Sequence, residues 1–430
     1  MFERYFKLEE HGTSIRTEVL AGLTTFLTMA YIIFVNPSIL SEAGMDRGAV
    51  FVATCLAAAL GTAIMGLYAN YPIALAPGMG LNAYFTYGVV LGMGYTWQVA
   101  LGAVFLSGII FIVISILPIR EAIINAIPQS LKMAISAGIG LFLGIIGLAN
   151  AGIIADHPVT LVTIGDLTQP APILAVIGFI AIAALTAWRV PGAIIISILG
   201  VSIIGMVLGV SQFGGVFDMP PSMAPTFLQL DISGALSIGL LSIVFAFLFV
   251  DLFDTAGTLV GVAHRAGLLT SEGKLPRLGR ALMADSTATV AGSIFGTSTT
   301  TSYIESAAGA NAGGRTGLTA ITVAILFVLA IFLAPLATSI PGYATAPALI
   351  FVACLMARGL AEVDWDDVTE YAPALVTAIS MPLTYSVAHG IAFGFIAYAA
   401  IKLLSGRFRE ASPTVVILAI LFVVKFAYLG

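Results

Sequence analysis

The sequence predicts an all-α polytopic membrane protein in which two interrupted segments line a binding site. Of its 430 residues, 59% are hydrophobic and only 9% are charged, and the mean hydropathy is +1.07. A soluble domain carries about 25% charged residues. Two stretches depart from the apolar pattern, YPIALAPGMGLNAYF at 71–85 and GTSTTTSYIESAAG at 296–309. Hydrocarbon cannot satisfy loose backbone groups, so such stretches are typical of backbone that lines the polar site of a secondary transporter.

Apolar segments of roughly spanning length follow one another along the chain. They lie at 18–40, 49–68, 73–91, 98–117, 128–149, 171–188, 191–209, 235–263, 277–296, 298–312, 315–335, 343–360, 372–387 and 388–404. A last apolar piece covers 412–430, and whether it spans the membrane stays open. Residues 1–16 are polar, so we expect no cleavable signal peptide. Cys55 and Cys354 lie within apolar segments, so we expect no disulfide framework and no metal site.

The basic residues indicate the orientation of these segments. If the N-terminus is cytoplasmic and each of the fourteen segments crosses once, fifteen of the 17 Lys and Arg residues fall on the cytoplasmic side, as the positive-inside rule requires. They are Arg4, Lys7, Arg16, Arg120, Lys132, Arg189, Arg265, Lys274, Arg277, Arg280, Arg315, Arg358, Lys402, Arg407 and Arg409. Seven crossings followed by seven more place the second half upside down relative to the first, which predicts an inverted repeat.

Four carboxylates lie well inside the apolar segments: Asp251, Asp254, Asp285 and Glu305. Each ionised carboxylate at mid-membrane costs about 2.5–3.5 kcal/mol, so we expect them to face a cavity, to pair or to be protonated. Hydrogen bonding between helices by neutral acids is the alternative. For Asp285 we favour a structural role, with pairing to Arg277 or Arg280, which precede it closely.

Asp251 and Asp254 stand three residues apart in FVDLFDTAGT and therefore share one helix face. Like charges this close cannot both ionise cheaply, so one of the two is suited to loading and unloading a proton. Glu305 lies near the start of a predicted half-helix, where backbone N–H groups bind acceptor groups. Asn82 occupies the comparable place after PGMG in the first half, as a helix cap or as a ligand-binding amide.

A carboxylate that faces an amide suits a flat heterocycle with N–H donors and ring-nitrogen acceptors. Tyr84, Phe85, Phe253 and Tyr303 are aromatic residues near these groups that can stack on such a ring. An intramembrane enzyme would need a Ser–His pair or metal ligands at depth, but the four histidines map to segment ends or loops, so we expect no enzyme. The residues alone do not exclude an ion channel.

The sequence resembles the AzgA-type purine permeases of the nucleobase–ascorbate transporter superfamily, which have a UraA-like fold. The resemblance covers nearly the whole chain. It rests on RTEVLAGLTTFLTMAYIIFVNP (16–37), PGMGLNAYF (77–85), VDLFDTAGT (250–258), ADSTAT (284–289) and GTSTTTSYIESAAGANAGGRTGLTA (296–320).

The resemblance implies fourteen transmembrane segments as two inverted repeats of seven, with short strands in segments 3 and 10. A core domain would comprise segments 1–4 and 8–11, at 17–118 and 234–336. A gate domain would comprise segments 5–7 and 12–14, at 119–210 and 341–430. The implied activity is proton-coupled uptake of adenine, guanine and hypoxanthine by an elevator mechanism. We expect a multi-pass protein of the bacterial inner membrane that needs no cofactor besides the proton and binds no nucleic acid. Whether it is a monomer or a homodimer through the gate domain stays open.

The resemblance also implies roles for single residues. Asn82, Asp251 and Glu305 would bind the purine, with Phe253, Ser302 and Tyr303 as further substrate-binding residues. Asp254, Asp251 and Glu305 are the candidates for proton coupling. A xanthine or uracil carrier of the same fold is the nearest alternative. An anion transporter is a weaker one, since three carboxylates would repel its substrate.

Overall fold

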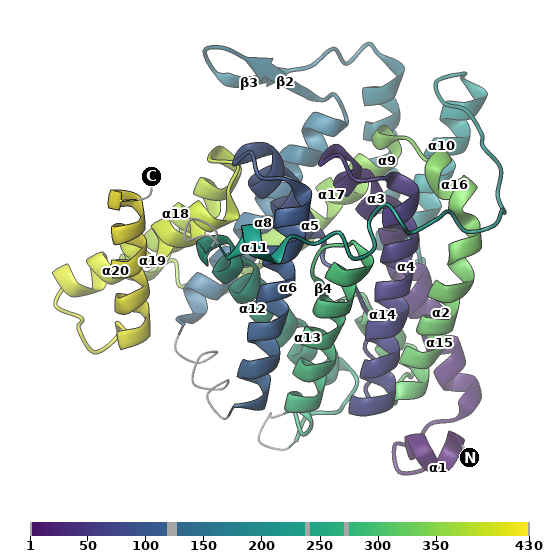
Figure 1. Ribbon diagram of the computed structural model, residues 1–430, viewed down its shortest axis with the longest axis horizontal. Coiled ribbons are helices and arrows are strands. Elements are labelled where there is room, and N and C mark those ends of the chain that lie inside the picture. The colour runs from purple at the N-terminus through teal and green to yellow at the C-terminus, as the bar shows by residue number, and fades with distance from the viewer. Residues whose placement is uncertain (1, 118–126, 237–240, 271–274, 429–430) are drawn as a thin grey trace.

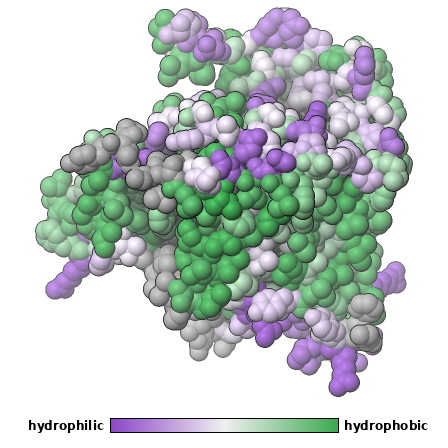
Figure 2. Space-filling model, viewed as in Figure 1, coloured by the Kyte–Doolittle hydropathy of each residue, from purple (hydrophilic) through white to green (hydrophobic). Residues whose placement is uncertain are grey.

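The molecule is a bundle of helices whose apolar middle lies between two polar ends. The computed structural model describes residues 2–117, 127–236, 241–270 and 275–428. Arg120, Lys274 and the expected domain boundary at 118/119 lie outside these ranges. Figure 2 shows a hydrophobic band with hydrophilic residues above and below it. Nine helical stretches of the described chain are long and apolar enough to cross a membrane, which confirms a mostly helical, polytopic membrane protein.

The order of elements is as follows. The first half contains α1 (Phe2–Phe6), α2 (Ile15–Met29), α3 (Ile32–Glu42), α4 (Arg47–Ile64), η1 (Met65–Ala69), β1 (Leu75–Pro77), α5 (Met79–Ala83), η2 (Tyr84–Gly92), α6 (Trp97–Ile116), α8 (Gln129–Asn150), β2 (Ile154–His157), β3 (Leu161–Ile164), α9 (Pro170–Ala187) and α10 (Ala193–Val207). The second half contains α11 (Ile232–Ala235), α12 (Leu241–Arg265), α13 (Leu278–Phe295), β4 (Thr300–Ser302), α14 (Ser306–Asn311), α15 (Gly317–Ala330), η4 (Ile331–Leu333), α16 (Ala334–Ser339), α17 (Gly342–Ala357), η5 (Arg358–Glu362), α18 (Val368–Leu383), α19 (Val387–Leu404) and α20 (Pro413–Tyr428).

The helices pack in two sets. In one set, α13 packs against α4 and α6, and α15 packs against α2 and α4. In the other set, α8 packs against α17 and α18, α9 packs against α10 and α17, and α18 packs against α19. The C-terminal helix α20 packs mainly against α19 and stands at one side of the bundle (Figure 1). The exposed β2–β3 hairpin lies at the end of the molecule opposite to the N-terminus (Figure 1).

Two short strands from the two halves of the chain meet in the interior. β1 pairs antiparallel with β4, with Leu75 opposite Ser302 and Pro77 opposite Thr300. All residues of both strands are buried. β1 leads into α5 and β4 leads towards α14, so each strand is followed by a short helix. Gly296 permits the entry into β4, because its φ of +95° lies in the left-handed region that favours glycine.

A buried carboxylate joins the first helix of the bundle to α15. Glu18 on α2 is fully buried. Its Oε1 accepts a hydrogen bond from the backbone N–H of Arg315 at 2.9 Å. Its Oε2 accepts from the backbone N–H of Thr316 at 3.2 Å and from the Thr319 hydroxyl at 2.6 Å. Glu18 therefore satisfies donors at the start of α15 that the helix itself leaves free.

Candidate substrate-binding site

At the crossing of β1 and β4, protein groups within the bundle satisfy hydrogen-bonding groups of the backbone. Beyond the ladder, the N–H of Gly78 donates to the carbonyl of Thr299 at 2.9 Å, and the N–H of Tyr303 donates to the carbonyl of Ala74 at 2.9 Å. The Ser306 hydroxyl accepts from the N–H of Ala74 at 3.0 Å. Interrupted backbone is tolerated at membrane depth where protein groups satisfy it in this way. The polar side chains that follow each strand are thereby held at a fixed place.

Glu305 lies directly before α14 and is partly exposed. Its Oε1 accepts a hydrogen bond of 2.5 Å from the hydroxyl of Tyr31. Tyr31 is fully buried at the junction between α2 and α3. The Thr28 hydroxyl lies 3.4 Å from the backbone carbonyl of Glu305. A single strong donor thus orients the Glu305 carboxylate, while its exposed part remains open to a ligand.

Asn82 lies on α5, across the strand pair from the residues before α14. It is fully buried. Its Oδ1 accepts a hydrogen bond from the hydroxyl of Ser298, and its Nδ2 lies 3.4 Å from the carbonyl of Pro77. The Tyr303 hydroxyl also donates to the carbonyl of Pro77, at 2.6 Å. Asn82 and Tyr303 therefore both belong to the polar surroundings of the crossing, and both side chains have protein partners.

Two carboxylates, from the neighbouring helices α12 and α13, lie beside β4. Asp251 on α12 accepts a hydrogen bond from the Thr289 hydroxyl at 3.1 Å. Asp285 on α13 accepts from the Ser302 hydroxyl at 2.9 Å. One oxygen of each, Asp251 Oδ1 and Asp285 Oδ2, has no hydrogen-bond partner among the described residues. Both residues are buried, so the two unpaired oxygens are well placed to hold a proton.

The expected pairing of Asp285 with Arg277 or Arg280 does not occur among the described residues. Asp285 bonds Ser302 instead, because it lies on the face of α13 that packs on β4. The two arginines lie at the beginning of the same helix, more than one turn away. Asp285 consequently belongs, with Asp251, to the cluster of carboxylates beside β4.

Asp254 lies one turn beyond Asp251 on α12 and is exposed. Its neighbour Thr255 hydrogen-bonds Thr301 on β4, with 2.7 Å between the two hydroxyl oxygens, and so fixes α12 to the strand pair. The side chain of Phe253 lies outside the part of the chain that the structure describes. Asp254 and Glu305 are therefore the two acids of the crossing that are open to solvent.

Two hydroxyl donors to these acids were not among the sequence predictions. Tyr31 is the partner of Glu305, and Thr289 is the partner of Asp251. Both residues lie within the motifs at 16–37 and 284–289. In the sequence each is only a residue with a hydroxyl group in an apolar segment. Such residues are common, because Ser and Thr hydroxyls often bond the backbone of their own helix. The break between α2 and α3 that aims Tyr31 inward contains no Pro or Gly itself, and Pro37 lies further on, inside α3.

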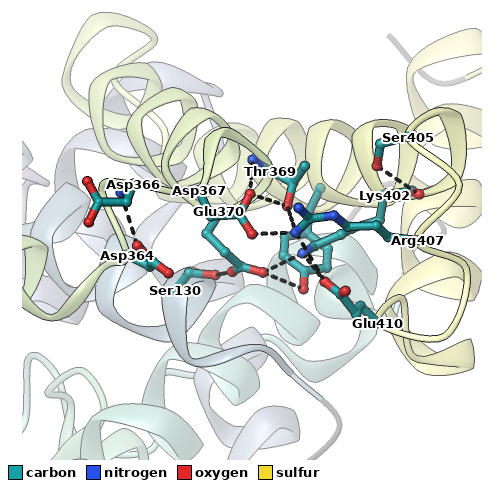
Figure 3. Close-up of polar contacts among 11 residues, drawn as sticks. Ser130, Asp364, Asp366, Asp367, Thr369, Glu370, Lys402, Ser405, Arg407 and Glu410 are labelled. Atoms are coloured by element: carbon teal, nitrogen blue, oxygen red, sulfur yellow. Dashed lines mark hydrogen bonds and ion pairs between the residues drawn. The ribbon is translucent and has the colours of Figure 1, made fainter.

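A second polar cluster joins α8, α18 and α19 to the chain before α20 (Figure 3). The side chain of Lys402 is fully buried, and its Nζ lies 2.7 Å from Glu370 Oε1 and 2.5 Å from Glu410 Oε2. Glu370 also accepts hydrogen bonds from Ser130 and from Tyr398. The adjacent pair of Arg407 and Asp367 extends the cluster towards solvent, since the two side chains are 43% and 22% exposed. These contacts connect several helix ends, so the cluster is structural in character.

The family model Xan_ur_permease, described as a permease family, matches residues 16–393. A putative permease of Methanocaldococcus jannaschii is 56% identical over 100% of this chain and 98% of its own length. The adenine permease AdeP of Escherichia coli is 50% identical over 100% of this chain and 96% of its own. The guanine/hypoxanthine permease PbuG of Bacillus subtilis is 48% identical over 99% of both.

Solved structures show the same fold at low identity. The transmembrane domain of the cyanobacterial bicarbonate transporter BicA has a TM-score of 0.65 at 15% identity and covers 89% of this chain and 97% of its own. The murine anion transporter Slc26a9, in the inward-facing state, has a TM-score of 0.66 at 11% identity and covers 92% of this chain and 69% of its own. At such identities the likeness shows the fold alone.

Proposed function

Because the chain belongs to the nucleobase–ascorbate transporter family of permeases, we propose that it carries adenine, guanine and hypoxanthine into the cell together with protons. The family and the relatives are permeases, not enzymes. Relatives that cover nearly the whole chain are described as adenine permeases or as guanine/hypoxanthine permeases, which supports a purine substrate.

The observation that carries this proposal is the Glu305 carboxylate, oriented by Tyr31 at the crossing of β1 and β4. A purine presents N–H donors along one edge, and an exposed carboxylate is an acceptor for them. In our proposal Glu305, Asn82 and Asp251 bind the base, and Phe253, Ser302 and Tyr303 complete the site. Because Asn82 and Ser302 bond protein groups in this structure, substrate binding would exchange or share those bonds.

For proton coupling we propose the acids of the same crossing, Asp254, Asp251 and Glu305. Repulsion between like charges that lie this close favours the uptake of a proton. A proton on this group would reduce the repulsion and strengthen purine binding. By linkage the purine would then strengthen proton binding by the same factor. Cytoplasmic release of the proton would weaken purine binding and so drive net uptake.

We further propose fourteen crossings in two inverted repeats, with a cytoplasmic N-terminus. The core domain would comprise 17–118 and 234–336, and the gate domain would comprise 119–210 and 341–430. The two sets of packed helices support this division. In an elevator mechanism the core domain would slide against the gate domain and carry the strand crossing across the membrane. The protein would lie in the cell membrane, as a monomer or as a homodimer through the gate domain.

Uptake of labelled hypoxanthine into proteoliposomes tests the function. We expect an imposed inward proton gradient to accelerate and increase uptake, and an imposed sodium gradient to leave it unchanged. Uptake that ignores the proton gradient and follows sodium would contradict proton coupling. Counterflow exchange of labelled purine should occur in a carrier, whereas an ion channel would show none.

A xanthine or uracil carrier of the same fold is the second candidate. Competition of unlabelled adenine, guanine, xanthine and uracil against labelled hypoxanthine decides between them, and we expect adenine and guanine to compete best. The structural likeness to anion transporters does not favour an anion substrate here, because Asp251, Asp254 and Glu305 converge on the crossing and would repel it.

A further inference from the structure

A pocket of about 540 Å³ lies away from the strand crossing, where the ends of η1, α6 and the beginning of α13 meet. Two guanidinium groups, those of Arg277 and Arg280, line it together with Tyr68. Ile116, the last residue of α6, forms part of its wall and is 67% exposed. The pocket thus combines positive charge with an apolar, outward-facing rim. The end of α6 and the beginning of α13, which carry its lining residues, lie at the bottom of Figure 1, on the side of the N-terminus.

The two arginines are positioned by aromatic rings and by backbone. The Arg277 guanidinium lies 4.6 Å from the centre of the Tyr71 ring, and its Nη2 donates to the carbonyl of Asn70 at 3.3 Å. The Arg280 guanidinium lies 5.6 Å from the centre of the Tyr68 ring. Contacts of this kind hold a guanidinium in place without neutralising its charge. Both positive charges therefore remain available to an anion.

No described carboxylate pairs with either arginine. The ion pairs found among the described residues involve Lys7, Lys402 and Arg407 instead. No acidic residue is among the residues that line the pocket. Two guanidinium groups that share a pocket repel each other, and an anion placed between them removes this repulsion. Guanidinium groups match phosphate oxygens in geometry, because each presents a fork of N–H donors.

The surroundings indicate which phosphate would bind. Leu67, Val113 and Ile116 are 49%, 50% and 67% exposed and belong to the same ends of η1 and α6. In a membrane protein, exposed apolar side chains directly beside an exposed arginine, here Arg280, mark the boundary between hydrocarbon and headgroups. Tyr68, which is 51% exposed, is typical of that boundary as well. A phosphate at this depth would carry its acyl chains along the apolar side chains.

We propose that this pocket binds the phosphate of an anionic phospholipid. Arg277 and Arg280 hold the phosphate oxygens, Tyr68 fixes Arg280, and the exposed apolar residues of η1 and α6 contact the acyl chains. Basic pockets between transmembrane helices are a recurring form of anionic lipid site. Met283 of α13 also lines the pocket, one half-turn before Asp285. The lipid would therefore contact the helix that carries one carboxylate of the crossing. The site itself does not depend on the identity of the transported substrate.

Native mass spectrometry of the delipidated full-length protein in detergent tests this site. The protein is titrated with phosphatidylglycerol, with phosphatidylcholine or with inorganic phosphate. We expect the first phosphatidylglycerol to bind in preference to phosphatidylcholine. Arg280→Gln should weaken the binding of that first lipid roughly fivefold, the usual contribution of one basic residue at a membrane surface. Among the described residues, the contact found for the Arg280 guanidinium is with an exposed ring, so the variant should fold normally, and its melting temperature verifies this.

Arg189→Gln is the matched control, because Arg189 is an exposed arginine after α9 and lies outside the pocket. It should leave the binding of the first lipid unchanged. An equal loss in Arg189→Gln and Arg280→Gln would show that only the general positive charge attracts the lipid, and would overturn the site. Equal binding of phosphatidylcholine, or inorganic phosphate that displaces the first phosphatidylglycerol at similar concentration, would overturn the lipid assignment.

Discussion

Tyr31→Phe should weaken hypoxanthine binding, because the Tyr31 hydroxyl holds the Glu305 carboxylate in its position. The hydroxyl donates to Glu305 Oε1 at 2.5 Å, and the tyrosine is fully buried. Phenylalanine keeps the ring and removes only the donor. Without the donor, Glu305 regains rotamer freedom that substrate binding must remove, at a cost of about 0.5–1.5 kcal/mol. Since about 1.4 kcal/mol corresponds to a factor of ten, Kd should rise about twofold to tenfold.

Glu305→Ala should have the larger effect, because it also removes the acceptor for the purine. Hydrogen bonds to a charged group contribute about 1.5–3 kcal/mol, which corresponds to at least a tenfold loss of affinity. If Tyr31 acts through Glu305, Tyr31→Phe should add no further loss in the Glu305→Ala protein. Isothermal titration calorimetry with hypoxanthine measures Kd for Tyr31→Phe, Glu305→Ala and the double variant.

Tyr84→Phe provides the control for this series. Tyr84 is fully buried near Asn82, and its hydroxyl has no hydrogen-bond partner among the described residues. Removing that hydroxyl should leave hypoxanthine binding unchanged. The reasoning is refuted if Tyr31→Phe binds like the wild type while Glu305→Ala does not bind. It is equally refuted if Tyr84→Phe loses as much affinity as Tyr31→Phe.

Three further predictions concern other parts of the molecule. Asp254→Asn should leave purine exchange in proteoliposomes more intact than proton-driven accumulation, and equal loss of both would indicate a binding or structural role. Hydrogen bonds from the backbone and hydroxyl of Thr369, with Arg407 nearby, lower the pKa of Asp367 to about 2, below the unfolded value of about 3.9. Asp367 therefore stabilises the fold above about pH 4 and loses this effect as the pH falls towards 2, so Asp367→Asn should flatten the acid side of the Tm–pH curve; an unchanged curve would contradict this. Lys402→Met should lower the free energy of unfolding by about 1 kcal/mol, because it removes the buried cation that pairs with the partly exposed Glu370 and the exposed Glu410. Adding Glu370→Gln should recover part of the loss, and denaturant unfolding without such recovery would argue against the pairing.

Much of the helical architecture could be predicted because its signals are local. Long apolar runs with few charges identify spans one at a time, as α6 and α8 illustrate. The polar stretches at 71–85 and 296–309 were expected to be interrupted, and the structure shows β1, α5, β4 and α14 there. The buried bond network of Glu18 was not expected. Its carboxylate lies at the edge of an apolar segment, where the sequence gives no reason to separate it from an exposed acid.

The site could be predicted less completely, because its contacts join distant parts of the chain. The sequence singled out Glu305 and Asp251 as acids in an apolar background, but not their donors Tyr31 and Thr289. The expected pairing of Asp285 with nearby arginines was wrong, since proximity in sequence does not determine which face of a helix a residue occupies. Only the packing of α13 on β4 brings Asp285 to Ser302.

The most direct test of the proposed function is a structure of the protein with hypoxanthine bound. We expect the purine beside the crossing of β1 and β4, with a ring N–H within about 3.2 Å of the Glu305 carboxylate and Asn82 within reach of the opposite edge. A purine bound elsewhere, with Glu305 bonded only to Tyr31, would contradict the proposed site.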